Sequence, residues 1–268
     1  MNLRLAFAFC AVAAVGAVGP ARAEEDLGAN AVGTAAEAPR AAEVAREGQL
    51  LPSTFSPIMG HKQVTGLFLG GYDSAPGQGP AFSAVVEGAL FNRVALRVGV
   101  DYQDAIHSVY PSVGLRVGLL RQEKYHVDVA VLGQYKNLGF SEASGEFEMG
   151  VLVGHRWSRL GLFANALYGQ GLDAGEHDAE ARVAVLYYAR PTLNVGLDAR
   201  ARLDLGADSP ARQKVKLQTD FDLVAGATAQ LTVWKHLVLT AEVGPHVVLI
   251  HEHPSVGAVA LAGFGATY

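Results

Sequence analysis

The sequence predicts an all-β fold: a transmembrane antiparallel β-barrel of about 12 strands. From His61 to Tyr268, apolar and polar residues alternate with the period of two that is typical of strands. Many of the alternating segments reach the length of about ten residues that a tilted strand needs to cross a bilayer. Charged residues keep to one face of these segments, which is the pattern expected when the other face meets lipid.

Residues 1–23 have the features of a cleaved signal peptide. Arg4 supplies a positive charge, an apolar stretch follows from Leu5 to Val18, and Ala21-Arg22-Ala23 matches the small-x-small pattern of a cleavage site. The apolar stretch is shorter than the ~20 residues of a membrane-spanning helix. We therefore expect export across the inner membrane and a mature chain without cysteine, because Cys10 is the only cysteine.

Residues 24–60 differ from the rest of the chain. They are rich in alanine and charge, and Thr34 and Glu37 have the spacing of a capping box, which predicts a short helix. The apolar face of this helix is almost entirely alanine and would bury little surface. We expect a periplasmic leader that is partly helical or disordered. A plug inserted into the barrel is the alternative.

The alternating pattern of residues 61–268 predicts the individual strands. The clearest case is the segment 93–102, where Val94, Leu96 and Val98 share one face while Arg97 and Asp101 occupy the other. The expected strands cover residues 62–72, 81–90, 93–102, 112–120, 126–136, 146–155, 160–170, 180–189, 193–204, 216–231, 237–250 and 257–268. Because their number is even, both ends of the barrel sequence are expected on one side of the membrane.

Short and long connections between these strands alternate. Short ones are expected at residues 91–92, 121–124, 157–159, 190–191 and 234–236, and long ones at 73–80, 103–111, 137–145, 171–179, 206–214 and 251–256. Bacterial outer-membrane barrels have tight periplasmic turns and long extracellular loops. The alternation of short and long connections therefore predicts that both ends of the barrel sequence lie on the periplasmic side.

The last strand carries a recognisable motif. It ends the chain on Tyr268, and Phe264 lies in the same register. This resembles the C-terminal strand signal of Gram-negative outer-membrane β-barrel proteins, which is read by the barrel-assembly machinery. The resemblance implies an outer-membrane location, with outer-membrane lipid, lipopolysaccharide and the assembly machinery as partners. It identifies no subfamily.

The polar face of the strands is expected to line the lumen. Its charged residues comprise six arginines and eleven acids: Glu87, Arg93, Arg97, Asp101, Arg116, Asp128, Glu146, Glu148, Glu180, Arg182, Asp198, Arg200, Arg202, Asp204, Asp220, Asp222 and Glu242. A barrel of twelve strands is intermediate in size between eight-stranded barrels, which side chains fill, and barrels of sixteen or more strands, which form open channels. Glycine and alanine on the inner face leave room, which favours a narrow porin-like channel for small hydrophilic solutes or cations.

Two alternatives stay open. The barrel could be a non-conducting scaffold whose loops or leader bind partners, with arginine–carboxylate pairs bracing its interior. It could also be a rim enzyme, either a lipid hydrolase or a protease, although we find no Gly-x-Ser-x-Gly elbow. His251-Glu252-His253 offers too few ligands for a convincing metal site. The formal net charge of −5 argues against nucleic acid as a partner. We expect no catalytic residues, metal or cofactor.

Overall fold

A computed structural model describes residues 40–58, 63–76, 78–91, 93–103, 108–137, 145–172, 176–207, 219–250 and 253–268. The expected signal peptide and the rest of the leader lie outside these ranges, as do parts of all six expected long connections. Within the described ranges, no helix is long and apolar enough to cross a membrane.

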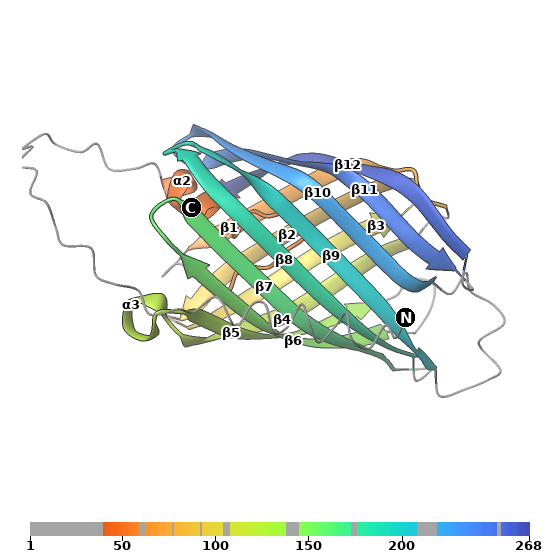
Figure 1. The fold of residues 1–268 in the computed structure, drawn as a ribbon. Helices are drawn as coiled ribbons and strands as arrows, with labels where there is room; N and C mark the ends of the chain where they lie inside the picture. The colour runs from red at the N-terminus through yellow and green to blue at the C-terminus, as the bar shows by residue number, and fades with distance from the viewer. Residues whose placement is uncertain are drawn as a thin grey trace, which may run out of the picture. The chain divides into compact units, whose positions relative to one another are not determined.

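Twelve antiparallel strands form a closed barrel (Figure 1). The strands are β1 (Val64–Asp73), β2 (Pro80–Phe91), β3 (Val94–Gln103), β4 (Ser108–Leu120), β5 (Asp128–Asn137), β6 (Gly145–Arg156), β7 (Leu160–Gly171), β8 (Glu176–Arg190), β9 (Leu193–Ala207), β10 (Thr219–Trp234), β11 (Leu237–Ile250) and β12 (His253–Thr267). Each strand pairs with its neighbours in the chain, and β1 pairs with β12 to close the ring. The predicted fold and strand number are confirmed.

Three strands begin four residues earlier than the sequence indicates. β4, β8 and β12 start at Ser108, Glu176 and His253, where they still pair with β3, β9 and β11. The expected long connections at 103–111, 171–179 and 251–256 are therefore shorter than predicted. The reason is that hairpin pairing continues past the point where the apolar alternation ends, because backbone hydrogen bonds do not depend on side-chain polarity.

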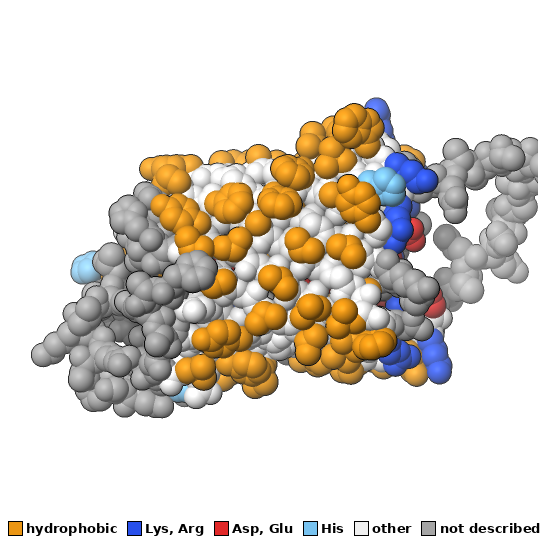
Figure 2. All heavy atoms as spheres, turned by 180° about the vertical axis from the view of Figure 1, so that it is seen from behind, with side chains coloured by type: hydrophobic (Ala, Val, Ile, Leu, Met, Phe, Trp, Pro, Cys, Tyr) orange, Lys and Arg blue, Asp and Glu red, His pale blue; other side chains and the backbone are white. Residues whose placement is uncertain are grey.

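The outer wall is apolar and the inner wall is polar. Side chains such as Val98, Val151, Leu197 and Val243 are exposed on the outside, where apolar residues cover the wall between the two ends (Figure 2). Buried polar side chains point inward: Gln134, Glu148, Asn165, Asp198, Gln230 and Glu242. This is the arrangement that lipid outside and a polar interior require.

The two ends of the barrel sequence meet at the end with the short turns. Val64 and Tyr268 exchange backbone hydrogen bonds of 3.0 and 2.9 Å. At the seam between β1 and β12, the rings of Phe68 and Phe264 stack with centroids 5.1 Å apart, and Tyr268 stacks on His236 at 5.5 Å. The two residues of the assembly motif thus face outward. A one-turn helix, α3 (Gln122–Tyr125), forms the connection between β4 and β5 at this end (Figure 1).

Residues 40–58, called here the inserted segment, lie against the inner wall of the barrel. The helix α2 (Arg40–Arg46) lies at the short-turn end, where the backbone N–H of Ala41 donates to the carbonyl of Lys235 at 3.0 Å. Ala41, Val44 and Leu50 are buried together with Val238 of β11. Residues 40–58 therefore have the arrangement of the plug alternative, and residues 24–39 of the expected leader lie outside the described residues. The alanine-rich face suffices because the wall opposite it is also apolar.

Candidate functional site in the barrel lumen

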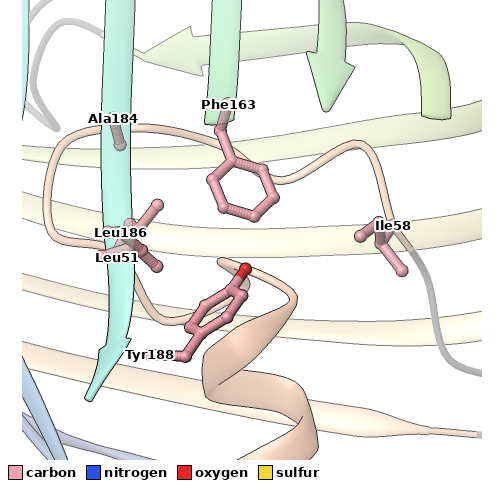
Figure 3. Close-up of a cluster of buried hydrophobic side chains, with 6 residues drawn as sticks. All are labelled: Leu51, Ile58, Phe163, Ala184, Leu186 and Tyr188. Carbon is pink, nitrogen blue, oxygen red and sulfur yellow. The ribbon is translucent and has the colours of Figure 1, made fainter. Parts of the chain in front are cut away.

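The inserted segment rests on an apolar patch of the inner wall. Leu51 and Ile58 pack with Phe163, Leu186 and Tyr188, and Ala184 completes the cluster (Figure 3). The Tyr188 hydroxyl donates to the carbonyl of Arg46 at 2.8 Å. Phe163 and Leu186 are fully buried. Inward-facing apolar side chains of this size would be costly in a wet lumen, so the segment covers them.

Gly48 lets the chain turn from α2 into the lumen. Its φ of 70° lies in the left-handed region, which residues with a Cβ rarely adopt. A Cβ at this position would also lie 2.9 Å from the ring of Phe163. The turn and the close contact with the wall both require glycine here.

The tip of the inserted segment, residues 53–56, is held by two buried acids. The backbone N–H of Ser53 donates to Asp198 Oδ2 at 3.0 Å, and the Thr54 hydroxyl donates to Asp198 Oδ1 at 2.5 Å. The Ser53 hydroxyl donates to Glu242 Oε2 at 2.9 Å. Strands β9 and β11 thus supply acceptors for a stretch of backbone that forms no helix or strand.

Phe55 connects nearly opposite walls of the barrel. Its ring lies between the guanidinium groups of Arg97 on β3 and Arg182 on β8, with centroid distances of 4.6 and 4.1 Å. These strands are five places apart in the ring of twelve. The Phe55 backbone N–H donates to Asn165 Oδ1 at 2.7 Å, and Asn165 Nδ2 donates to the Phe55 carbonyl at 2.8 Å. The tip therefore crosses the lumen.

The arginines around the tip are paired with acids and with carbonyls of the segment. Arg116 donates to the carbonyl of Ser56 and to Glu87. Arg182 donates to Glu180 and, at 2.8 Å, to the carbonyl of Ser53. Charge-assisted bonds of this kind are stronger than neutral ones. They fix the position of the segment together with the packing of Phe55 against a buried apolar cluster of Ala130, Leu132, Leu152 and Leu167.

Beyond the tip lies a cavity of about 100 Å³ lined by Ser53, Asp73, Gln78, Gly79, Pro80, Ala81, Arg200, Val224, Val259 and Leu261. Beside it runs a row of charged groups. His246 Nδ1 lies 2.5 Å from Asp73 Oδ2, and His246 Nε2 lies 3.1 Å from Asp222 Oδ2. Arg200 lies 3.6 Å from the same carboxylate. The lumen on this side of the tip is thus lined by both signs of charge.

A smaller cavity of about 30 Å³ lies at the short-turn end and is lined in part by Glu47, Ile58, Asp128 and Arg156. Glu47 Oε1 is 3.4 Å from Arg156 Nη1. Burial raises the pKa of Glu47 to about 7, although Arg156 acts in the opposite direction. Glu47 is therefore a group of the inserted segment that titrates near neutral pH.

The expected lumen residues fall into several groups. Those that touch the tip or pair directly with its contacts are Glu87, Arg97, Arg116, Glu180, Arg182, Asp198 and Glu242. Those that form polar contacts elsewhere on the strands are Glu148 with Lys136, Arg200 with Asp222, Arg202 with Asp178, and Asp204 with the N–H of Gly206. Asp101 and Glu146 are half-buried on β3 and β6.

Three expected residues lie at the edge of this region or outside the described side chains. Arg93 is exposed in the turn before β3, because the strand begins only at Val94. Asp128 is buried at the short-turn end, 3.7 Å from Arg156. The side chain of Asp220 lies outside the described part of the structure.

Sequence reasoning missed several residues of the lumen. Asn165 and His246 are buried and face inward with the same parity as the expected charged residues, so a search that included uncharged polar residues would have found them. Ser53, Thr54 and Phe55 had no local signal. A signal did exist on the wall, since Phe163 and Leu186 are large apolar residues at inward positions.

Of the group His251-Glu252-His253, the first two residues lie outside the described part of the structure. In the part of the chain that is described, no three His, Cys, Asp or Glu side chains are grouped so as to hold a metal.

No protein-family model and no curated protein matches the sequence. Solved structures do match. The NanC porin has a TM-score of 0.56 at 10% identity, over 76% of this chain and 99% of that chain. The KdgM porin in complex with disordered oligogalacturonate has a TM-score of 0.55 at 8% identity, over 77% and 99%. An outer membrane channel from Pseudomonas putida F1 has a TM-score of 0.52 at 10% identity, over 79% and 97%. At these identities the likeness concerns the fold. The chain therefore has the fold of the outer-membrane β-barrel porins, within the general class indicated by its C-terminal strand.

Proposed function

We propose that the protein is a narrow outer-membrane channel for small hydrophilic solutes or cations, and that the inserted segment forms its constriction. The observation that carries this proposal is the way the tip is held. Residues 53–56 are held on the inner wall by hydrogen bonds and charge pairs, with a cavity of about 100 Å³ directly beyond them.

Unpartnered polar groups on the inner wall support a hydrated lumen. Buried atoms without a hydrogen-bond partner in the described protein include Asn194 Oδ1, Gln230 Nε2, Thr240 Oγ1 and Glu242 Oε1. Buried polar atoms of this kind normally bind water. A scaffold barrel closed by its own side chains would instead satisfy these groups internally.

A disulfide between the tip and the wall tests the proposal. Thr54 and Asp198 are in direct contact, so Thr54→Cys with Asp198→Cys is expected to lock the segment in place when oxidised. Conductance is recorded in a planar bilayer before and after reduction. We expect low conductance in the oxidised state and a several-fold rise on reduction. The reversal potential of the same recordings measures the preference for cations.

The matched control is the pair Val131→Cys with Val151→Cys, which lie opposite each other on β5 and β6 and do not touch the segment. Its conductance should not change on reduction. If the folded protein does not conduct with the segment locked, released or deleted, the channel proposal is wrong and the scaffold alternative takes its place. Turnover of lipids or peptides by non-conducting protein would favour a rim enzyme.

A further inference from the structure

The short turns of the barrel carry exposed positive charge around the whole rim. Their exposed cations are Arg93 between β2 and β3, Arg121 and Lys124 between β4 and β5, Arg159 between β6 and β7, Arg190 at the end of β8, and Lys235 between β10 and β11. Glu123 is the acid among the described residues of these five turns. Figure 2 shows Lys and Arg side chains gathered at one end of the apolar wall.

Several of these cations are available to an external partner. Arg159, Arg190 and Lys235 form no side-chain ion pair with any residue that the structure describes, and all three are exposed. The Lys124 ammonium lies 5.2 Å from the ring centroid of Tyr125. Lysine and arginine so placed can reach toward an anion without breaking a contact that stabilises the fold.

Exposed aromatic side chains lie in the same ring of turns. Trp157 is 45% exposed, Trp234 75% and Tyr268 70%. His155 packs edge-on against Trp157 at 4.1 Å, and His236 stacks on Tyr268 at 5.5 Å. Tryptophan and tyrosine prefer the depth of the lipid headgroups. The cations therefore lie at or just beyond the level of the lipid phosphates.

We infer that this rim, made of Arg159, Arg190, Lys235 and the neighbouring aromatic residues, binds the headgroups of anionic phospholipids. The distribution of charge favours lipid over a single protein partner, because the cations are spread over five turns of a closed ring. Each turn can contact a separate small anion. Short turns face the periplasm in barrels of this class, so these groups meet the phospholipid leaflet.

The tryptophans allow a direct test. The sequence has two, and both lie on this rim. The full-length protein is reconstituted in phosphatidylcholine vesicles, and either phosphatidylglycerol or phosphatidylcholine with brominated chains is added as a quencher. We expect brominated phosphatidylglycerol to quench several-fold more effectively at low salt. This preference should fall at high salt, where surface charges are screened.

We expect the two brominated lipids to quench the triple variant Arg159→Gln, Arg190→Gln, Lys235→Gln equally. The reason is that each of these three charges contributes to the attraction of anionic headgroups. The control is Arg202→Gln, an exposed arginine of β9 that pairs with Asp178 away from this rim, and it should keep the preference. Heat-modifiable migration on a gel confirms that every variant is a folded barrel.

Other outcomes contradict the inference. Equal quenching by both lipids in the unmodified protein, or an unchanged preference in the triple variant, would show that the rim does not select anionic lipid. In a further experiment, the quenching is measured with an excess of soluble glycerol phosphate. If it removes the preference, the site recognises free phosphate and the lipid inference is wrong.

Discussion

At the scale of single residues, Phe55 is the side chain with the most informative position. Its ring is held by arginines from two nearly opposite strands, and its backbone N–H and carbonyl bond to the side-chain amide oxygen and nitrogen of Asn165. A contact between a cation and an aromatic ring contributes about 0.5–2 kcal/mol, depending on how dry its surroundings are. The ring thus links the two walls across the lumen.

Phe55→Ala is expected to raise single-channel conductance several-fold. The substitution removes the ring that crosses the lumen and leaves Arg97 and Arg182 without their shared contact. Planar-bilayer recordings measure the effect. Phe147→Ala on the exposed outer wall is the matched control and should leave conductance unchanged. Equal conductance in the two variants would show that Phe55 does not restrict the path.

The raised pKa of Glu47 predicts that the stability of the inserted segment depends on pH. Its pKa is about 7 in the folded protein against 4.5 for a free glutamate, so the segment gains stability on protonation. The contribution, at most about 3 kcal/mol, is present below pH 4.5 and is lost as the pH rises through 7. The pKa of this carboxyl group includes the effects of the charged and polar groups that face it, which are Arg156, Glu43, Asp128 and Gln49.

We therefore expect residues 40–58 to exchange their amide hydrogens more slowly at pH 5 than at pH 8, after correction for intrinsic exchange. Glu47→Gln should abolish most of this difference and keep the slow exchange at pH 8, because glutamine has no charge to bury. The same pH dependence in the variant and the unmodified protein would assign the effect to another group.

At the scale of elements, the inserted segment combines an apolar base with a polar tip. The base packs on β7, β8 and β11, and the tip bonds to β4, β7, β8, β9 and β11. Neither half resembles an isolated stable element, since α2 has only seven residues. The wall therefore determines the conformation of the segment.

Leu51→Ala should loosen the segment and leave the barrel intact. Replacing a buried leucine by alanine costs about 2–5 kcal/mol, and here the cost falls on the contact between the segment and Phe163. We expect faster proteolysis within residues 40–58 and unchanged migration of the folded barrel on a gel. Leu205→Ala, at an exposed outer position of β9, is the control and should not change the cleavage rate.

At the scale of the whole molecule, stability depends on the match between the outer wall and lipid. Leu197 lies about a third of the way along β9 from the short-turn end and is 65% exposed, while Leu205 lies near the far end of the same strand. Arginine on the lipid face costs about 2–4 kcal/mol at the bilayer midplane and about 0–1 near the interface.

Leu197→Arg should therefore lower the free energy of unfolding in vesicles by about 2–4 kcal/mol, and Leu205→Arg by about 1 kcal/mol or less. Denaturant titration followed by tryptophan fluorescence measures both. A similar cost at the two positions would mean that β9 does not cross the bilayer as described.

Much of this architecture could be predicted because it repeats. The lipid-facing residues Val98, Val151 and Leu197 obey one rule of alternation on strand after strand, and the connections repeat in length. Local signals of this kind need no knowledge of distant contacts. The early starts of β4, β8 and β12 escaped prediction because backbone pairing leaves no mark in the side chains.

The residues alone determined a closed twelve-stranded barrel and its apolar outer face, since both follow from the period of a local pattern. Only the tertiary structure showed that residues 40–58 enter the lumen and that Phe55 meets Arg97 and Arg182. Contacts between a terminal segment and strands more than a hundred residues away depend on shape and on complementary polar groups, which no short sequence pattern records.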